Sequence, residues 1–380
     1  MTLIDGQRRT RNSLADKIST YLNNRLASPG FQSWAARFPL TRRQARRDGE
    51  RLMDLTAGFV HSQILQAVVA LDLLEHLADG PRSVGQLAVM SGLSEARMRR
   101  LCRAAVALDL LKFRSKDRVA LARLGAALRG VPGLPEMILH HNILYRDLAD
   151  PVGFFRGETS PELADFWPYV FGQGAEIDGA QAERYSALMA QSQSLVAEET
   201  LQVVSLSGAE HLLDIGGGTG AFLAAVGQKY PALSVTLFDL PEVSSAAAAR
   251  FVKSGMRERS TVVAGNFQVD PLPAGADAIS LIRVLYDHET ATVRRLLSQI
   301  FEALPPNGRL LISEPMSGGD APHRAGDAYF AIYCMAMGTG TVRSPAEITR
   351  LLTDAGFTSI DVPRMRRRFI TQTIVARKPL

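Results

Sequence analysis

A glycine turn between an apolar run and a helix constrains this chain more than any other feature of its sequence. Residues 211–215 are mostly apolar and carry Asp214 near their end. Glycines follow at positions 216, 217, 218 and 220, and the helix-forming run 221–226 begins directly after them. A strand, a glycine turn and a helix are the layout of a nucleotide-binding site, in which backbone amides and a helix N-terminus face the ligand.

The glycines alone do not select the ligand. Gly216 and Gly218 fit the dinucleotide fingerprint, but Ala221 stands at its third glycine, which only the looser form of the motif allows. The turn is not followed by Gly-Lys-Ser/Thr, which argues against a P-loop. A second acid, Asp239, ends the next apolar run, close to the roughly 20 residues at which an acid reaches a ribose.

The two acids favour a ligand that is cationic at one end and carries a ribose at the other. Asp214 is a poor partner for a pyrophosphate and suits an ammonium group, because like charges repel and opposite charges attract. S-adenosylmethionine has both the ammonium group and the ribose. The alternatives are a nicotinamide-binding fold and a glycine turn without a ligand.

The segment Leu212–Gly220 resembles the first motif of class I S-adenosylmethionine-dependent methyltransferases. This resemblance implies that Phe267 covers the adenine ring and that Asn266 hydrogen-bonds its edge. Relatives usually carry aspartate at the place of Asn266, and an amide can still accept from the exocyclic amine. The residues that the resemblance assigns to the cofactor are Tyr185, Met189, Asp214, Gly216, Gly218, Asp239, Leu240, Asn266, Phe267 and Arg283. For Tyr185 and Met189, ordinary helix packing is the alternative.

Alternating strands and helices in the C-terminal half predict an α/β fold with a mostly parallel, doubly wound, Rossmann-like sheet. The predicted strands are Leu212–Ile215, Val235–Phe238, Thr261–Ala264, Ala278–Ile282 and Leu310–Ser313, with the clearest helix at Glu289–Leu304. Ser344–Glu347 reads as a capping box with proline at the first helical position. Two final strands, Ser359–Val362 and Phe369–Ala376, could pair antiparallel, as the tail of a class I methyltransferase does.

The N-terminal half predicts a winged helix. Helical periodicity runs from Arg51 to Leu77, two shorter helices follow at Ser83 and Ser94, and a hairpin turns at residues 115–117. Such a module reads DNA in regulators and serves as a dimerisation domain in small-molecule methyltransferases. The nucleotide fold downstream favours the second use, so we predict a homodimer without a nucleic-acid partner. A regulator with a Rossmann-like sensor domain is the alternative.

We therefore divide the chain into an N-terminal arm (1–50), a mostly helical winged-helix dimerisation and substrate-lid domain (51–178), and a methyltransferase domain that binds S-adenosylmethionine (179–380).

The loop after the fourth predicted strand of the sheet carries the catalytic residues by resemblance. Residues 281–289 are similar to the Arg/Lys-x-Leu-His-Asp-Trp segment of the caffeate and acetylserotonin type of O-methyltransferase, in which the histidine takes the hydroxyl proton. Tyr286 stands at the histidine's place, His288 stands where tryptophan is usual, and Glu314 matches the glutamate that buttresses the histidine.

This departure leaves the base to be chosen by chemistry. Histidine, with a pKa of roughly 6.5, accepts a proton readily at neutral pH, whereas tyrosine, at about 10, is normally protonated. We predict His288 as the base, with Tyr286 and Asp287 orienting it. The alternative is that His288 has no part in the chemistry and that proximity and desolvation of the acceptor dominate.

The Tyr-Asp-His variant and the residues at 329–338 and 343–345 resemble one branch, the hydroxyneurosporene (demethylspheroidene) O-methyltransferases of carotenoid biosynthesis. The branch implies methylation of a tertiary hydroxyl at the end of a long polyene. The residues predicted to contact this acceptor are Met137, His141, Phe155, Tyr329 and Met335. A phenol, a polyketide and a bacteriochlorophyll-type tetrapyrrole are the other acceptors left open.

Composition bounds the location and partners. Cys102 and Cys334 lie in apolar helical contexts and predict reduced thiols of a cytoplasmic protein without a disulfide. The N-terminus lacks an apolar core of signal-peptide length, and the sequence has no apolar run long enough to span a membrane. The net charge of +5 and the arginine clusters leave loose attachment to the inner face of a membrane as an alternative to solvated faces. The His140–His141 pair lacks further ligands at metal spacing, so we expect no metal site.

Overall fold

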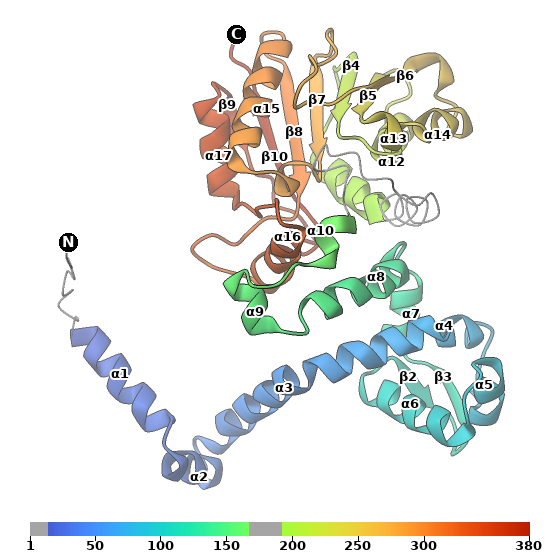
Figure 1. Cartoon of the computed structure of the whole chain (residues 1–380), viewed down its shortest axis with the longest axis vertical. Helices are drawn as coiled ribbons and strands as arrows, with labels where there is room; N and C mark the ends of the chain where they lie inside the picture. The colour runs from blue at the N-terminus through green and yellow to red at the C-terminus, as the bar shows by residue number, and fades with distance from the viewer. Residues whose placement is uncertain (1–13, 167–191) are drawn as a thin grey trace.

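The computed structural model describes residues 14–166 and 192–380. A seven-stranded sheet domain lies at one end, a small winged-helix module at the other, and the helices α8, α9 and α10 lie between them (Figure 1). The predicted boundary at residues 178 and 179 falls outside the described residues.

The N-terminal helices extend away from the rest of the chain (Figure 1). The helix α1 (Leu14–Leu26), which is described in full, has no buried residue. The helix α2 (Pro29–Arg37) begins where the Ser28 hydroxyl accepts from the Phe31 amide, so the predicted break at Ser28–Gly30 starts a new helix. The long helix α3 (Arg42–Ala70) begins within the predicted arm.

The winged-helix prediction is confirmed in its helices and hairpin, with one correction. A three-stranded antiparallel sheet packs beside the paired helices α5 and α6. The predicted helix from Arg51 to Leu77 is broken, because Asp72 has a left-handed backbone (φ 51°) that an α-helix cannot contain. The elements are α3, α4 (Leu73–His76), β1 (Arg82–Ser83), α5 (Val84–Met90), α6 (Glu95–Ala107), β2 (Leu111–Phe113), β3 (Arg118–Leu121) and α7 (Arg123–Arg129).

The predicted Rossmann-like sheet is confirmed. Its strand order is β6-β5-β4-β7-β8-β10-β9. The first five strands in this order are parallel, and β10 is antiparallel to its neighbours β8 and β9. The strands are β4 (His211–Ile215), β5 (Ser234–Asp239), β6 (Ser260–Ala264), β7 (Ala278–Ile282), β8 (Arg309–Glu314), β9 (Thr358–Asp361) and β10 (Gln372–Arg377). The helices around it include α12 (Ala221–Lys229), α13 (Pro241–Ser244), α14 (Ala247–Lys253), α15 (Thr290–Ala303) and α17 (Pro345–Asp354).

Two apolar cores cover the two faces of the sheet, as a doubly wound fold requires. The strand order reverses at β4, which has β5 on one side and β7 on the other. Ligands of such sheets bind beyond the carboxyl ends of the strands at this switch point. The fold therefore directs attention to the loops after β4, β5, β6 and β7.

Helices from both halves of the chain pack together below the sheet. The helix α8 (Leu134–Asp147) contacts α16 (Ala331–Met337), and α10 (Glu162–Phe166) packs on the same helix. A small apolar cluster, which includes Phe154 of α9 (Pro151–Arg156) and Met337, closes this junction. Within residues 14–166 and 192–380, no helix combines the length and the apolar character needed to cross a membrane.

Candidate active site

The glycine turn after β4 has the backbone of a ligand-binding turn. Gly216, Gly218 and Gly220 have φ angles of 69°, 58° and 75°, in the left-handed region that favours glycine. A Cβ on Gly218 would meet no atom within 4 Å, whereas a Cβ on Gly220 would lie 2.8 Å from the Phe251 ring. The turn is thus open at Gly218 and closed against the core at Gly220.

Asp239, at the end of β5, holds this turn from the side. One carboxylate oxygen accepts from the Gly218 amide and the other from the Leu240 amide, both at 2.7 Å. Burial raises the pKa of Asp239, and the two amide hydrogen bonds oppose that rise by favouring the charged form. Each carboxylate oxygen has a second lone pair, so the same group can also accept from the hydroxyls of a ribose.

Asp214 lies behind the turn and is fully buried. The Ser280 hydroxyl of β7 donates to its Oδ1 at 2.5 Å, and Oδ2 has no hydrogen-bond partner among the described residues. Burial raises the pKa of Asp214 to about 7. A Cβ on Gly217 would lie 2.6 Å from Asp214 Oδ2, so the turn packs closely on this carboxyl group. The predicted contact of Asp214 with a ligand ammonium group stays a prediction.

The predicted adenine residues lie at the end of β6. The Asn266 amide donates to Asp270, and its side-chain oxygen accepts from the Gln268 amide at 2.9 Å, which fixes the loop. The Phe267 ring meets the His288 ring edge-on at a centroid distance of 5.2 Å. The structure therefore brings the predicted adenine residue and the predicted base into direct contact.

Hydrogen bonds with Arg283, Glu314 and Arg343 fix the loop at residues 286–288. The Tyr286 amide donates to Glu314 of β8 at 3.2 Å, and Arg283 donates to the Tyr286 hydroxyl at 3.3 Å. Arg343 donates to the carbonyls of Leu285 and His288, both at 2.8 Å. We had assigned no role to Arg343, although its position in an Arg-Ser-Pro segment before a capping box marks it in the sequence.

Burial shifts the pKa of four groups at this site, namely Tyr286, Asp287, His288 and Glu314. It raises the pKa of Glu314 to about 8 and that of Asp287 to about 7, because a desolvated carboxylate is unfavourable. It lowers the pKa of His288 to about 4 and raises that of Tyr286. At neutral pH His288 is therefore an uncharged imidazole, and Tyr286 keeps its proton.

A cavity of about 560 Å³ lies between α8, the helix at 192–203 and the loops after β7 and β8. Most of its lining is apolar. It is lined by Val131, Pro132, Gly133, Leu134, Met137, His141, Ser192, Leu195, Val196, Arg283, Pro315, Arg324, Ala325, Tyr329, Phe330, Arg367, Phe369 and Ile370. A mostly apolar cavity of this size with a few polar groups suits an apolar small molecule.

The cavity contains some of the residues predicted to contact the acceptor and not others. Met137, His141 and Tyr329 line it, together with Arg283, which we had assigned to the cofactor. Phe155 and Met335 lie outside this lining, and their side chains are 59% and 42% exposed. On each helix the buried place is taken by a neighbour, Phe154 on α9 and Cys334 on α16. The structure does not place Phe155 and Met335 together with Met137 in this cavity, and their predicted acceptor contacts stay predictions. Tyr185 and Met189 lie outside the described residues.

Two histidine–tyrosine pairs join α8 to the segment that follows β8. His141 Nε2 lies 2.6 Å from the Tyr329 hydroxyl, and His140 Nε2 lies 2.8 Å from the Tyr333 hydroxyl. Tyr329 belongs to the π-helix η4 (Arg324–Phe330) and Tyr333 to α16. Only the first pair lines the cavity among the residues that the structure describes. Sequence reasoning did not find either pair, because each joins residues almost 200 positions apart.

Comparisons with known proteins cover nearly the whole chain. Residues 145–358 match the family described as the O-methyltransferase domain, and residues 53–130 match the O-methyltransferase dimerisation domain. Demethylspheroidene O-methyltransferase of Cereibacter sphaeroides is 52% identical over 94% of this chain and 95% of that protein. Its counterpart in Rhodobacter capsulatus is 52% identical over 90% of this chain and 85% of that protein.

Solved structures agree with this fold. Human N-acetylserotonin methyltransferase in complex with SAM is 25% identical, with a TM-score of 0.72, over 88% of this chain and 98% of that one. A mitomycin 7-O-methyltransferase is 25% identical, with a TM-score of 0.73, over 88% of this chain and 99% of that one.

Proposed function

Because this chain belongs to the O-methyltransferase family and is an S-adenosylmethionine-dependent O-methyltransferase, we propose that its acceptor is the hydroxyl of a 1-hydroxycarotenoid, such as demethylspheroidene or hydroxyneurosporene. The observation that carries this proposal is the 52% identity to two demethylspheroidene O-methyltransferases over at least 90% of the chain. The reaction would belong to spheroidene-type carotenoid biosynthesis.

The cavity supports an apolar acceptor with one hydroxyl group. Its polar side chains, which include His141, Arg283 and Tyr329, can contact the hydroxylated end of the molecule, and its apolar lining can hold the adjoining hydrocarbon. A volume of about 560 Å³ suits the end of a long polyene. We propose that the remainder of the polyene extends out of the cavity.

We propose that the cofactor lies along the carboxyl ends of β4, β5 and β6. The turn at 216–220 would offer backbone amides, Asp239 and Leu240 would meet the ribose, and Asn266 and Phe267 would meet the adenine. S-adenosylmethionine supplies an electrophilic methyl group on a cationic sulfur when it is bound. Anionic Asp239 beside open backbone at Gly218 supports this placement.

His288 as the base, with Tyr286, Asp287 and Glu314 positioning it, stays our prediction from the sequence. Its uncharged imidazole supports the assignment, because only the neutral form accepts a proton. Its place against Phe267, outside the lining of the cavity, weighs against it. Turnover of His288→Ala tests the assignment, since loss of a general base lowers kcat roughly 100-fold or more.

The match to a dimerisation domain supports a homodimer.

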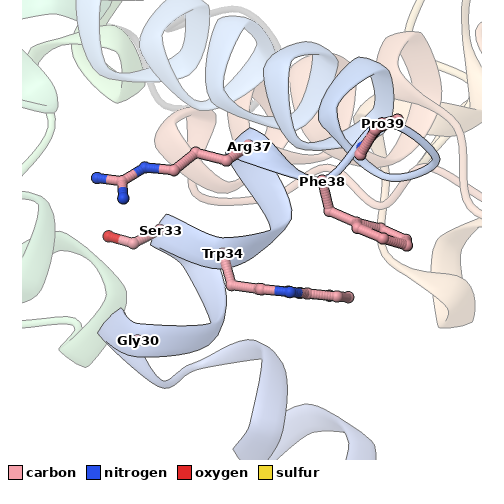
Figure 2. Close-up of a pocket in the computed structure, with 6 residues that line it drawn as sticks. All are labelled: Gly30, Ser33, Trp34, Arg37, Phe38 and Pro39. Carbon is pink, nitrogen blue, oxygen red and sulfur yellow. The ribbon is translucent and has the colours of Figure 1, made fainter.

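We further propose a cytoplasmic protein that touches the inner face of a membrane through α2. Trp34 and Phe38 stack at 4.7 Å and are 49% and 36% exposed, and Arg37 projects from the same helix (Figure 2). Amphipathic aromatic rings and arginine favour the headgroup region of anionic bilayers. Flotation with anionic vesicles tests this, and Trp34→Ser/Phe38→Ser should reduce the bound fraction.

The acceptor is tested by a turnover screen with S-adenosylmethionine labelled in its methyl group. Purified protein would be mixed in detergent with 1-hydroxycarotenoids, a phenol, a polyketide and a bacteriochlorophyll-type tetrapyrrole. We expect label in the methoxycarotenoid. Label only in one of the other products would overturn the proposed acceptor and leave the methyltransferase assignment intact.

A further inference from the structure

His141 and Tyr329 form a short hydrogen bond in the wall of the cavity. His141 lies on α8 and Tyr329 on η4, and both side chains line the cavity. The distance of 2.6 Å between Nε2 and the tyrosine oxygen is that of a short, well-formed hydrogen bond. The sulfur of Met137, at 3.6 Å, is a second and weaker neighbour of the same hydroxyl.

The direction of this hydrogen bond depends on the tautomer of His141. Burial lowers the pKa of His141, so its imidazole is neutral at neutral pH. Burial also raises the pKa of Tyr329, so the phenol keeps its proton. In the His141 tautomer that carries its proton on Nδ1, Nε2 accepts that phenolic proton in the hydrogen bond. The oxygen of Tyr329 then has lone pairs left to accept a hydrogen bond from a molecule in the cavity.

We propose that Tyr329 and His141 remove the proton of the acceptor hydroxyl during methyl transfer. As the acceptor oxygen forms its bond to the methyl carbon, the carbon–sulfur bond breaks and the sulfonium becomes a neutral thioether. The hydroxyl proton passes to the Tyr329 oxygen while the phenolic proton passes to His141 Nε2. The products are a neutral ether, a neutral tyrosine and an imidazolium, which later returns its proton to solvent.

The loop where relatives carry their base favours this assignment. Tyr286, which replaces the expected histidine, is buried and its hydroxyl accepts from Arg283. His288 packs on Phe267, on the side of the proposed adenine site. By contrast, His141 and Tyr329 both line the acceptor cavity.

Charged groups around the cavity affect how readily His141 takes up a proton. Arg283, Arg324 and Arg367 line it, and His140 neighbours His141 on α8. Nearby cations disfavour a second positive charge, so they keep His141 uncharged between turnovers and also make proton transfer to it less favourable. The carboxylates of Glu198 and Glu199 pair with Arg367 at 3.0 and 2.7 Å and so are engaged there.

The neighbouring pair offers a matched control. His140 and Tyr333 come from the same two segments and make the same kind of hydrogen bond, but they do not line the cavity in the described structure. Tyr329→Phe and His141→Gln should lower kcat roughly 100-fold or more, the loss typical of a missing general base. The same substitutions at Tyr333 and His140 should leave kcat within threefold of wild type. KM and the affinity for S-adenosylmethionine should change little in all four variants.

A readout other than activity separates a proton path from a structural contact. Titration of histidine-labelled protein by NMR should show a shift of the His141 pKa in Tyr329→Phe and none in Tyr333→Phe. In wild type, kcat should fall at acid pH as His141 becomes protonated, and Tyr329→Phe should lose that dependence. If His141→Gln does not fold, Tyr329→Phe, which removes a single oxygen atom, still decides the question.

This inference rests on the proposed function, yet the two fail separately. Lack of turnover of 1-hydroxycarotenoids by wild type refutes the proposed acceptor, and the variants are then compared on whichever hydroxyl acceptor wild type methylates. Wild-type kcat in both Tyr329→Phe and His141→Gln, together with an inactive His288→Ala, overturns the proton path. If wild type methylates none of the acceptors, the proton path is rejected with the function on which it depends.

Discussion

Two glycines of one turn, Gly218 and Gly220, should differ in what alanine changes. Gly218→Ala should mainly weaken cofactor binding, and Gly220→Ala should mainly lower stability. Both have left-handed backbones, with φ angles of 58° and 75°. They differ in their surroundings, because a Cβ at 218 meets open space and a Cβ at 220 lies 2.8 Å from the buried ring of Phe251. The pair therefore separates the strain of the backbone from the crowding of the core.

The magnitudes follow from these two contributions. A left-handed backbone costs alanine about 1–2 kcal/mol, partly offset by about 0.4–1 kcal/mol from the less flexible unfolded chain. Gly218→Ala should thus lower the free energy of unfolding by about 1 kcal/mol or less. Gly220→Ala carries the same strain plus about 1–3 kcal/mol for overpacking against Phe251, so its loss should reach about 1–5 kcal/mol.

Binding of S-adenosylmethionine should show the reverse order. The Gly218 amide donates to Asp239, and the open space beside it is where we place the cofactor, so a methyl group there should weaken binding. Gly220→Ala should bind the cofactor nearly as well as wild type while it is folded. Urea unfolding and calorimetric titration measure the two quantities. Equal stability of the variants, or undiminished affinity in Gly218→Ala, would refute this account of the turn.

Three further changes have definite expected outcomes. Asp239→Asn should weaken S-adenosylmethionine binding about 10-fold or more in calorimetric titration, because charged hydrogen bonds contribute about 1.5–3 kcal/mol; an unchanged Kd would count against the ribose contact. Ser280→Ala should lower the free energy of unfolding by about 1–3 kcal/mol in urea, because it removes the donor to buried Asp214. Burial raises the pKa of Glu314 from 4.5 to about 8, so the folded chain holds this proton more tightly than the unfolded one. The protonated Glu314 therefore stabilises the fold fully below pH 4.5, and this contribution is lost as the pH rises through 8. The free energy of unfolding, measured across this pH range, should fall less steeply in Glu314→Gln than in wild type. An identical slope in the two proteins would contradict this prediction.

The sheet could be predicted from the sequence because its signals are local. Central strands are buried on both faces, so their sequences are short apolar runs. A glycine follows the run at β4, and an aspartate ends the run at β5. The capping box at Ser344 involves residues three apart, and the structure shows both of its hydrogen bonds. Each observed strand lies within about three residues of its predicted ends.

The break at Asp72 could not be predicted in the same way. The apolar periodicity continues from α3 into α4, and both helices contribute buried residues to one core. Asp72 tolerates the left-handed backbone better than most residues do, but this tolerance does not say that the helix must break there. Packing of α4 against α7 accompanies the bend, and that contact is between separate elements.

Some residues of the proposed acceptor site could be predicted from the sequence, and others could not. Apolar composition pointed to Met137, Phe155 and Met335 alike, yet only Met137 lines the cavity, because which side of a short helix is buried depends on its neighbours. Arg343 acts on the carbonyls of the loop at 285–288, a contact that leaves no pattern in the composition. Resemblance predicts the cofactor loops because the residues of each motif are close in sequence.

The exchange of histidine for tyrosine at position 286 becomes understandable once the two halves of the chain are seen together. In this chain the loop after β7 presents a phenol held by Arg283, and the acid behind it, Glu314, accepts from a backbone amide. A base is still required close to the acceptor, and α8 brings His141 from the N-terminal half to Tyr329. The packing of α8 against the segment after β8 then completes the acceptor site as well as joining the domains. A helix that closes the cavity can in this way also provide the base, so a histidine at position 286 is not required.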